Sequence, residues 1–145
     1  MQTNTSILAL DFGAKRVGVA LASSVARLPH PLTTLVADDG LFDKIAEIIA
    51  REAVDTIVVG LPRGLDGQHT AQTQAVEDFT AELKNHVTVP IYQQDEALTS
   101  RQAEIELAAR GGTYQKGDID ALAATYILED FLATLPRNTE EETTA

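Results

Sequence analysis

The first third of the chain contains three extended segments before any helical pattern begins, and this order restricts the folds that it can adopt. Residues 6–11 and 16–22 are both rich in apolar side chains, and a short turn containing Gly13 separates them, which is typical of a β-hairpin. Residues 31–36 follow at the end of a Pro-His-Pro triplet, which disfavours a helix. Three successive strands with short connections predict an antiparallel meander.

Strands and helices alternate in the rest of the chain. Apolar residues recur at helical spacing over about residues 38–53, and the continuous apolar run at 56–60 is typical of a strand buried on both faces. A helix over about 69–85 and a strand over 87–92 repeat this order, which predicts parallel strands joined by right-handed crossovers. Two more helices are expected near the C-terminus, one from Thr99 to Gly111 and one over about residues 118–134.

The predicted fold is therefore an α/β sandwich with helices on both faces of one mixed five-stranded sheet. A length of 145 residues is consistent with one domain, because domains commonly contain about 150 residues. We expect residues 1–136 to form this domain. Residues 137–145 include three consecutive glutamates and are predicted to be an acidic, disordered tail.

The composition excludes several classes of function. The chain contains no cysteine, which rules out disulfides, thiolate metal sites and cysteine nucleophiles. Its apolar runs are much shorter than the ~20 residues of a membrane span, and the N-terminus lacks a signal pattern, so we expect a cytoplasmic protein with no membrane partner. The three histidines have no metal-ligand spacing, and no Walker-type loop or dinucleotide fingerprint is present.

The charge balance argues against non-specific binding to nucleic acid. Lysine and arginine number 11 and aspartate and glutamate 22, which gives a formal net charge of −11. Such a field repels phosphates and anionic membranes. A local basic patch or bound metal ions can override it, so a nucleic-acid enzyme is not excluded.

Carboxylates stand at the ends of several predicted elements. Asp11 ends the first strand, Asp95 and Glu96 follow another strand, and Asp120 lies near the start of the last helix, after Asp118 as the expected N-cap. Taken singly, each has a structural alternative as a turn residue or a helix leader. In this element order they can converge at one sheet edge. Clustered carboxylates repel one another unless a cation neutralises them, and Mg²⁺ or Mn²⁺ prefer such oxygen ligands.

The few basic residues lie close in sequence to these acids. Singly, each is expected to be a solvated surface charge, whereas together they predict a positive rim that holds phosphates. The candidates for nucleic-acid binding are Lys15, Arg16, Arg63, Arg101 and Lys116.

Four segments in order resemble the YqgF/RuvX family of the ribonuclease H-like superfamily, and the resemblance covers about residues 6–133. They are residues 10–20, 59–67, 95–100 and 116–124. The family is described as Holliday-junction resolvases and as nucleases that mature the 5′ end of 16S rRNA. The resemblance implies a three-layer ribonuclease H-like fold and metal-binding, catalytic acids at Asp11, Glu96 and Asp120, with Asp95 beside them as a further metal ligand.

One position departs from the family pattern. The family usually has arginine directly after the Asp-Glu pair, and this chain has Ala97, so a phosphate contact there is either missing or supplied by Arg101.

The resemblance implies a nuclease that uses Mg²⁺ or Mn²⁺, as two ions, on structured nucleic acid. Precursor 16S rRNA is the favoured substrate and branched DNA the alternative, with the protein a monomer or weak homodimer. A non-catalytic binding module on the same fold is a rival, which Ala97 and the net charge favour. An actin-like phosphotransferase also begins with a strand, Asp-x-Gly and a hairpin, but needs two domains.

Overall fold

The structure, a computed structural model, describes residues 4–64, 67–96, 105–106, 108–109 and 116–136. Its centre is a mixed five-stranded sheet with the strand order β3-β2-β1-β4-β5. This is the sheet that the element order predicts. The strands are β1 (Ser6–Phe12), β2 (Arg16–Ser23), β3 (His30–Val36), β4 (Val54–Pro62) and β5 (Ile91–Glu96).

β1 lies in the middle of the sheet and joins its two halves. It pairs antiparallel with β2, which pairs antiparallel with β3, and it pairs parallel with β4, which pairs parallel with β5. The turn between β1 and β2 is closed by a hydrogen bond of 2.8 Å that the Gly13 amide donates to the Arg16 carbonyl. The antiparallel meander and the later parallel strands are both confirmed.

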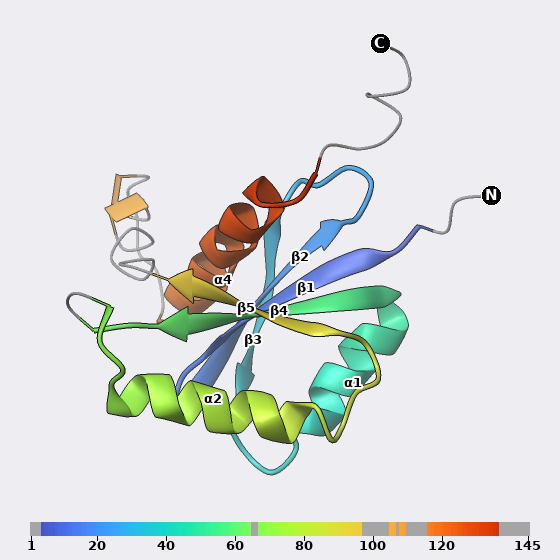
Figure 1. Cartoon of the computed structure of the whole chain (residues 1–145). Helices are drawn as coiled ribbons and strands as arrows, with labels where there is room; N and C mark the ends of the chain where they lie inside the picture. The colour runs from blue at the N-terminus through green and yellow to red at the C-terminus, as the bar shows by residue number, and fades with distance from the viewer. Residues whose placement is uncertain (1–3, 65–66, 97–104, 107, 110–115, 137–145) are drawn as a thin grey trace.

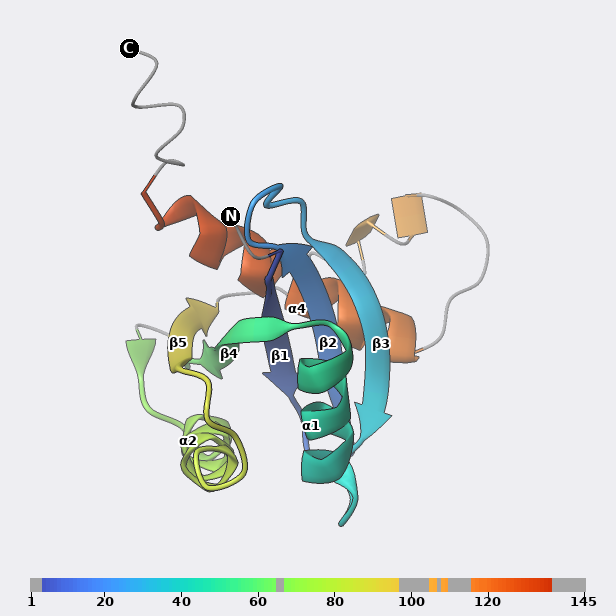
Figure 2. The same ribbon diagram turned by 90° about the vertical axis from the view of Figure 1, so that its right-hand side faces the viewer.

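Helices cover both faces of the sheet and complete three layers. Helices α1 (Leu41–Arg51) and α2 (Ala71–Leu83) lie on one face, and α4 (Lys116–Ala133) lies on the other (Figures 1 and 2). No helix in the described ranges is long and apolar enough to cross a membrane. Most of the helix expected from Thr99 to Gly111, and the whole tail at 137–145, lie outside the described residues.

The sheet separates two hydrophobic cores that differ in side-chain size. The face toward α1 and α2 buries large residues, such as Leu8, Leu10 and Phe79. The face toward α4 is built largely from alanines of the central strands, and these small side chains let the helix axis come close to the sheet. The alanines of this second core are Ala9, Ala20, Ala22 and Ala124.

Several element boundaries differ from the sequence prediction, and those of β5 and α4 bear on the candidate site. β5 begins at Ile91 instead of residue 87, because Pro90 lacks an amide hydrogen and cannot donate to the sheet ladder. The α4 helix begins at Lys116, two residues early. The expectation that Asp118 is the N-cap is therefore wrong: Asp118 lies inside the first turn, where its charge complements the helix dipole.

Helix α4 contacts the sheet most closely at Gly18. A β-carbon on Gly18 would overlap the carbonyl group of Asp120. Nearby, the Thr34 hydroxyl of β3 donates a 2.6 Å hydrogen bond to the Gly117 carbonyl. The start of α4 is therefore held against β2 and β3, and glycine at position 18 makes the contact possible.

We predict that Gly18→Ala destabilises the protein because the added methyl group must displace the backbone of α4. Overpacking of this kind costs about 1–3 kcal/mol of unfolding free energy, to be measured by urea denaturation. Gly117→Ala is the matched control, because the nearest atoms to a β-carbon there belong to the Thr34 side chain and lie 3.5 Å away or more, which is ordinary contact. Equal stability of the two variants would contradict the close packing at Gly18.

Candidate active site

Three acidic residues of the prediction come from three elements that meet on the α4 face of the sheet. Asp11 lies one residue before the end of β1 and follows Ala9 on the face that packs against α4. Glu96 ends β5 on the same side as Tyr92, whose ring centroid lies 5.7 Å from that of Phe131 in α4. Asp120 belongs to α4 itself. The strand ends and the helix thus bring their side chains toward one edge of the sheet.

The Glu96 carboxylate occupies a space that a glycine leaves open. A β-carbon on Gly60 of β4 would overlap both Oε2 of Glu96 and the end of the Ile127 side chain. This Oε2 is buried and has no hydrogen-bond partner among the described residues. Burial raises the pKa of Glu96 from an ordinary 4.5 to about 7. Glu96 is therefore a carboxylate with an unsatisfied acceptor in an apolar setting.

Asp11 lies in the field of the other two acids. Burial raises its pKa well above the ordinary value, and the negative charges of Glu96 and Asp120 raise the pKa further. The three carboxylates therefore interact electrostatically, although 85 residues separate Asp11 from Glu96 in sequence. A cation at this edge would relieve their repulsion.

One cation is already present in the form of Arg16. Its Nε lies 2.6 Å from Oδ2 of Asp120, and the two side chains are 37% and 23% exposed. Arg16 opens β2 on the same face as Gly18, so the strand that supports α4 also supplies the partner of its carboxylate. This ion pair fixes the direction of the Asp120 side chain.

The donor set suits a hard metal ion, but its oxygens are not gathered around one point. In the part of the chain that the structure describes, no group of three or more histidine, aspartate or glutamate side chains is arranged to hold a metal ion. Asp120 is directed toward Arg16. The buried Oε2 of Glu96, which lacks a donor, is the observation that favours a cation here, since carboxylate oxygens are the ligands of Mg²⁺ and Mn²⁺.

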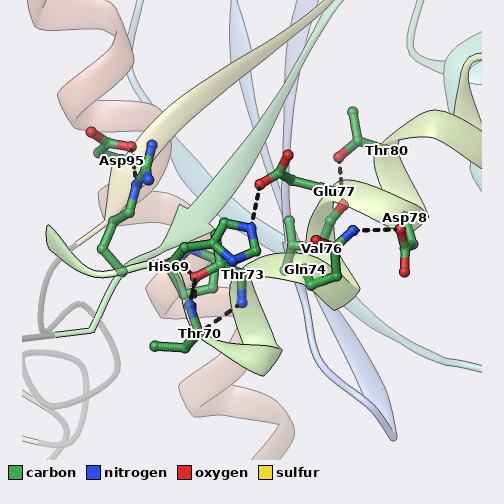
Figure 3. Close-up of polar contacts among 11 residues, drawn as sticks. His69, Thr70, Thr73, Gln74, Val76, Glu77, Asp78, Thr80 and Asp95 are labelled. Atoms are coloured by element: carbon green, nitrogen blue, oxygen red, sulfur yellow. Dashed lines mark hydrogen bonds and ion pairs between the residues drawn. The ribbon is translucent and has the colours of Figure 1, made fainter.

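Asp95 lies away from this cluster. Side chains alternate along a strand, so Asp95 points to the opposite face from Glu96. Its side chain is 71% exposed, and Oδ1 lies 3.3 Å from Nε of Arg63 (Figure 3). The sequence prediction placed Asp95 and Glu96 together, as one acidic pair at the end of this strand. Continuation of β5 to Glu96 separates them.

The basic residues of the prediction are distributed unevenly. Lys15 is exposed in the turn between β1 and β2, whereas Arg16 and Arg63 are each paired with an acid. Lys116 starts α4, and Arg101 lies outside the described residues.

Sequence reasoning missed the two features that shape the carboxylate cluster, which are the Arg16–Asp120 ion pair and the space above Gly60. An isolated glycine within a buried strand is a usable signal, because it commonly marks a close approach of another group.

The fold matches those of two solved proteins. The chain resembles the structure of RuvC from T. thermophilus in complex with Holliday junction substrate, with a TM-score of 0.53, 14% identity, and coverage of 89% of this chain and 94% of that one. The Holliday junction resolvase of fowlpox virus, solved with its substrate DNA, gives a TM-score of 0.53 at 12% identity, covering 92% and 100% of the two chains. At this identity the likeness establishes the ribonuclease H-like fold.

Closer relatives define the family. A family model described as "RuvX: Holliday junction resolvase" matches residues 5–134. A "Putative pre-16S rRNA nuclease" of Maridesulfovibrio salexigens is 40% identical over 131 residues, which cover 88% of this chain and 97% of the relative. A protein of the same name from Glaesserella parasuis is 36% identical, with coverage of 87% and 94%. The chain belongs to the RuvX family, as the resemblance indicated.

We predict that Glu96→Gln stabilises the metal-free protein at pH 8 and has little effect at pH 4. Folded Glu96 binds its proton up to a pH of about 7, whereas the unfolded residue loses it near 4.5. The wild-type protein therefore loses unfolding free energy as the pH rises across this interval, by at most roughly 3 kcal/mol. The amide removes this contribution because it does not ionise.

The measurement is urea denaturation between pH 4 and pH 8 in the presence of a chelator. Glu129→Gln is the control, since Glu129 is an exposed residue of α4. Wild-type and Glu96→Gln curves that run parallel over the whole pH range would show that Glu96 is not the buried acid that the structure describes.

Proposed function

We propose that the protein is a nuclease that depends on Mg²⁺ or Mn²⁺ and hydrolyses phosphodiester bonds during 5′-end maturation of precursor 16S rRNA. The observation that carries this proposal is the buried Oε2 of Glu96, which has no hydrogen-bond partner among the described residues and lies in one cluster with Asp11 of β1 and Asp120 of α4. The names of the family relatives support the choice of substrate.

Asp11, Glu96 and Asp120 would hold the metal, as one ion or a pair. The negative charges of Glu96 and Asp120 raise the pKa of Asp11, so a cation bound among the three would stabilise their ionised forms. When bound, the metal would polarise a phosphate oxygen of the substrate and activate a water molecule for attack. Asp95 faces away from this cluster, and its proposed part is to orient Arg63 through their ion pair.

Arg16 has a second part in this proposal. Its guanidinium neutralises Asp120 in the metal-free protein. If Asp120 were a ligand of the metal, Arg16 would be available to donate paired hydrogen bonds to a phosphate next to the cluster. Lys15, Arg63, Arg101 and Lys116 would contact the backbone farther along the substrate, where a positive charge contributes affinity without reading the sequence.

A four-way DNA junction is the second candidate substrate, favoured by the family description and by the RuvC fold. Its resolution needs two active sites, and hence paired subunits. We propose that the protein works in the cytoplasm as a monomer or weak homodimer. One active site is enough for a single cut in rRNA, so this state fits rRNA better than a four-way junction. A non-catalytic binding module, the rival on the same fold, would need no metal at the carboxylates.

We predict that Asp11→Asn abolishes cleavage while the protein stays folded. The amide keeps the shape of the side chain and loses the charge that binds a hard cation. Changes around a metal ligand already cost about 10–100-fold, so loss of a ligand should lower the rate at least about 100-fold. The assay uses a precursor 16S rRNA fragment and a four-way junction, each with Mg²⁺ or Mn²⁺.

Two further measurements interpret this result. Circular dichroism tests folding, and the change in melting temperature on adding Mn²⁺ reports metal binding independently of activity. Asp130→Asn, which changes an exposed residue of α4, is the control. Full activity of Asp11→Asn with an unchanged metal requirement would remove Asp11 from the site, and failure of the wild type to bind Mn²⁺ would favour the non-catalytic module.

Ala97→Arg tests the departure from the family. Position 97 lies outside the described residues, so the expectation rests on the sequence alone. An added phosphate contact should raise affinity at low salt and steepen the log–log salt dependence of binding by about 0.7–0.9. Binding of a non-cleavable RNA across a salt series measures this slope. An unchanged slope would mean that residue 97 does not reach the substrate.

A further inference from the structure

A pocket of about 470 Å³ lies on the face of the sheet opposite the carboxylate cluster. It is formed by the β1–β2 turn, the segment that leads into α1, and one side of α2. Its size falls within the range of about 300–1,000 Å³ that is usual for ligand sites. Neither the family comparison nor the proposed nuclease site uses it.

The floor of the pocket consists of three phenylalanine rings. Phe79 of α2 is 5% exposed and stacks on Phe12 of β1, with ring centroids 4.3 Å apart. The ring centroid of Phe42 in α1 lies 5.7 Å from that of Phe79. The His86 ring stacks on Phe42 at 4.3 Å. Because rings from three elements support one another, the floor is formed before any ligand arrives.

The walls of the pocket are acidic. They include the side chains of Asp38, Asp78 and Glu82. Oδ1 of Asp78 accepts a 2.9 Å hydrogen bond from the Gln74 amide (Figure 3). Oδ1 of Asp38 accepts one of 3.0 Å from the Gly40 backbone. Within the described ranges, none of these three carboxylates forms an ion pair with lysine or arginine. Nε2 of His86 lies 3.6 Å from Oε1 of Glu82. An aromatic floor is thus surrounded by uncompensated negative charge.

We propose that this pocket binds an arginine side chain from a basic segment of a protein partner. A planar guanidinium stacks on phenylalanine rings and donates hydrogen bonds to carboxylates at the same time. Phosphates are repelled by the acidic walls. Residues 137–145 of this chain contain one arginine, Arg137, but their net charge is negative because of the glutamates near the C-terminus, so the acidic walls disfavour this segment as the occupant. Proteins that bind nucleic acid are rich in such basic segments, and they form the partner class.

The probe is the peptide acetyl-(Gly-Arg)₄-amide, compared with its lysine and glutamate counterparts of equal length. Calorimetry at low salt gives the affinity, and NMR of the phenylalanine rings shows where the peptide binds. We expect the arginine peptide to shift the resonances of Phe12, Phe42 and Phe79. The lysine peptide should bind about threefold or more weakly, since it lacks a planar cation, and the glutamate peptide should not bind.

Paired variants separate the pocket from the general charge of the protein. Asp78→Asn with Glu82→Gln removes two pocket charges and should weaken arginine-peptide binding about tenfold. Glu129→Gln with Asp130→Asn makes the same change of net charge on exposed residues of α4 and should leave the affinity within about twofold. Ala75→Leu fills the pocket and should abolish binding while the circular dichroism spectrum stays unchanged.

Three outcomes would overturn the proposal. Equal weakening by the two double variants would show that only net charge attracts the peptide. Equal affinity of the lysine and arginine peptides would show that the pocket does not select the planar guanidinium. Displacement of the peptide by a short RNA that shifts the same rings would assign the pocket to nucleic acid. Because the pocket and the carboxylates lie on opposite faces, loss of peptide binding with intact cleavage leaves the proposed nuclease function untouched.

Discussion

The close packing of α4 against the small-residue face of the sheet is the contact on which the rest of the site depends. Alanines at 9, 20 and 22 and glycine at 18 remove side-chain bulk from the middle strands, so the helix backbone rests directly on β2. That approach carries Asp120 into the field of Asp11. With larger side chains on this face, α4 would lie farther from the sheet, and the Asp120 carboxylate would no longer lie close to Asp11.

Such packing brings acids together at a cost in stability. Glu96 is pressed into an apolar space above Gly60 and left without a hydrogen-bond donor, and Asp11 is destabilised both by burial and by its neighbours. If these residues served only the fold, a neutral side chain at either position would make the protein more stable. Clustered carboxylates with raised pKa values are typical of functional sites, and this supports the proposal that a cation binds here.

The two faces of the sheet carry different chemistry. The α4 face presents buried carboxylates beside Arg16, at the carboxyl ends of the central strands, where ligands commonly bind in open α/β sheets. The opposite face holds large apolar side chains and ends in the aromatic pocket with its acidic walls. Strand alternation produces this division, because neighbouring residues such as Asp11 and Phe12 point to opposite layers.

The sequence by itself determined the element order, the mixed sheet, and the placement of Asp11, Glu96 and Asp120 at element ends. These features depend on local periodicity, on breakers such as the Pro-His-Pro triplet before β3, and on topological rules that act along the chain. The four motif segments also sufficed to indicate the family. Only the tertiary structure decided that Asp95 faces away from Glu96 and that Arg16 pairs with Asp120. Such contacts join residues up to 104 positions apart, and they depend on strand length, register and helix position, which no local pattern encodes.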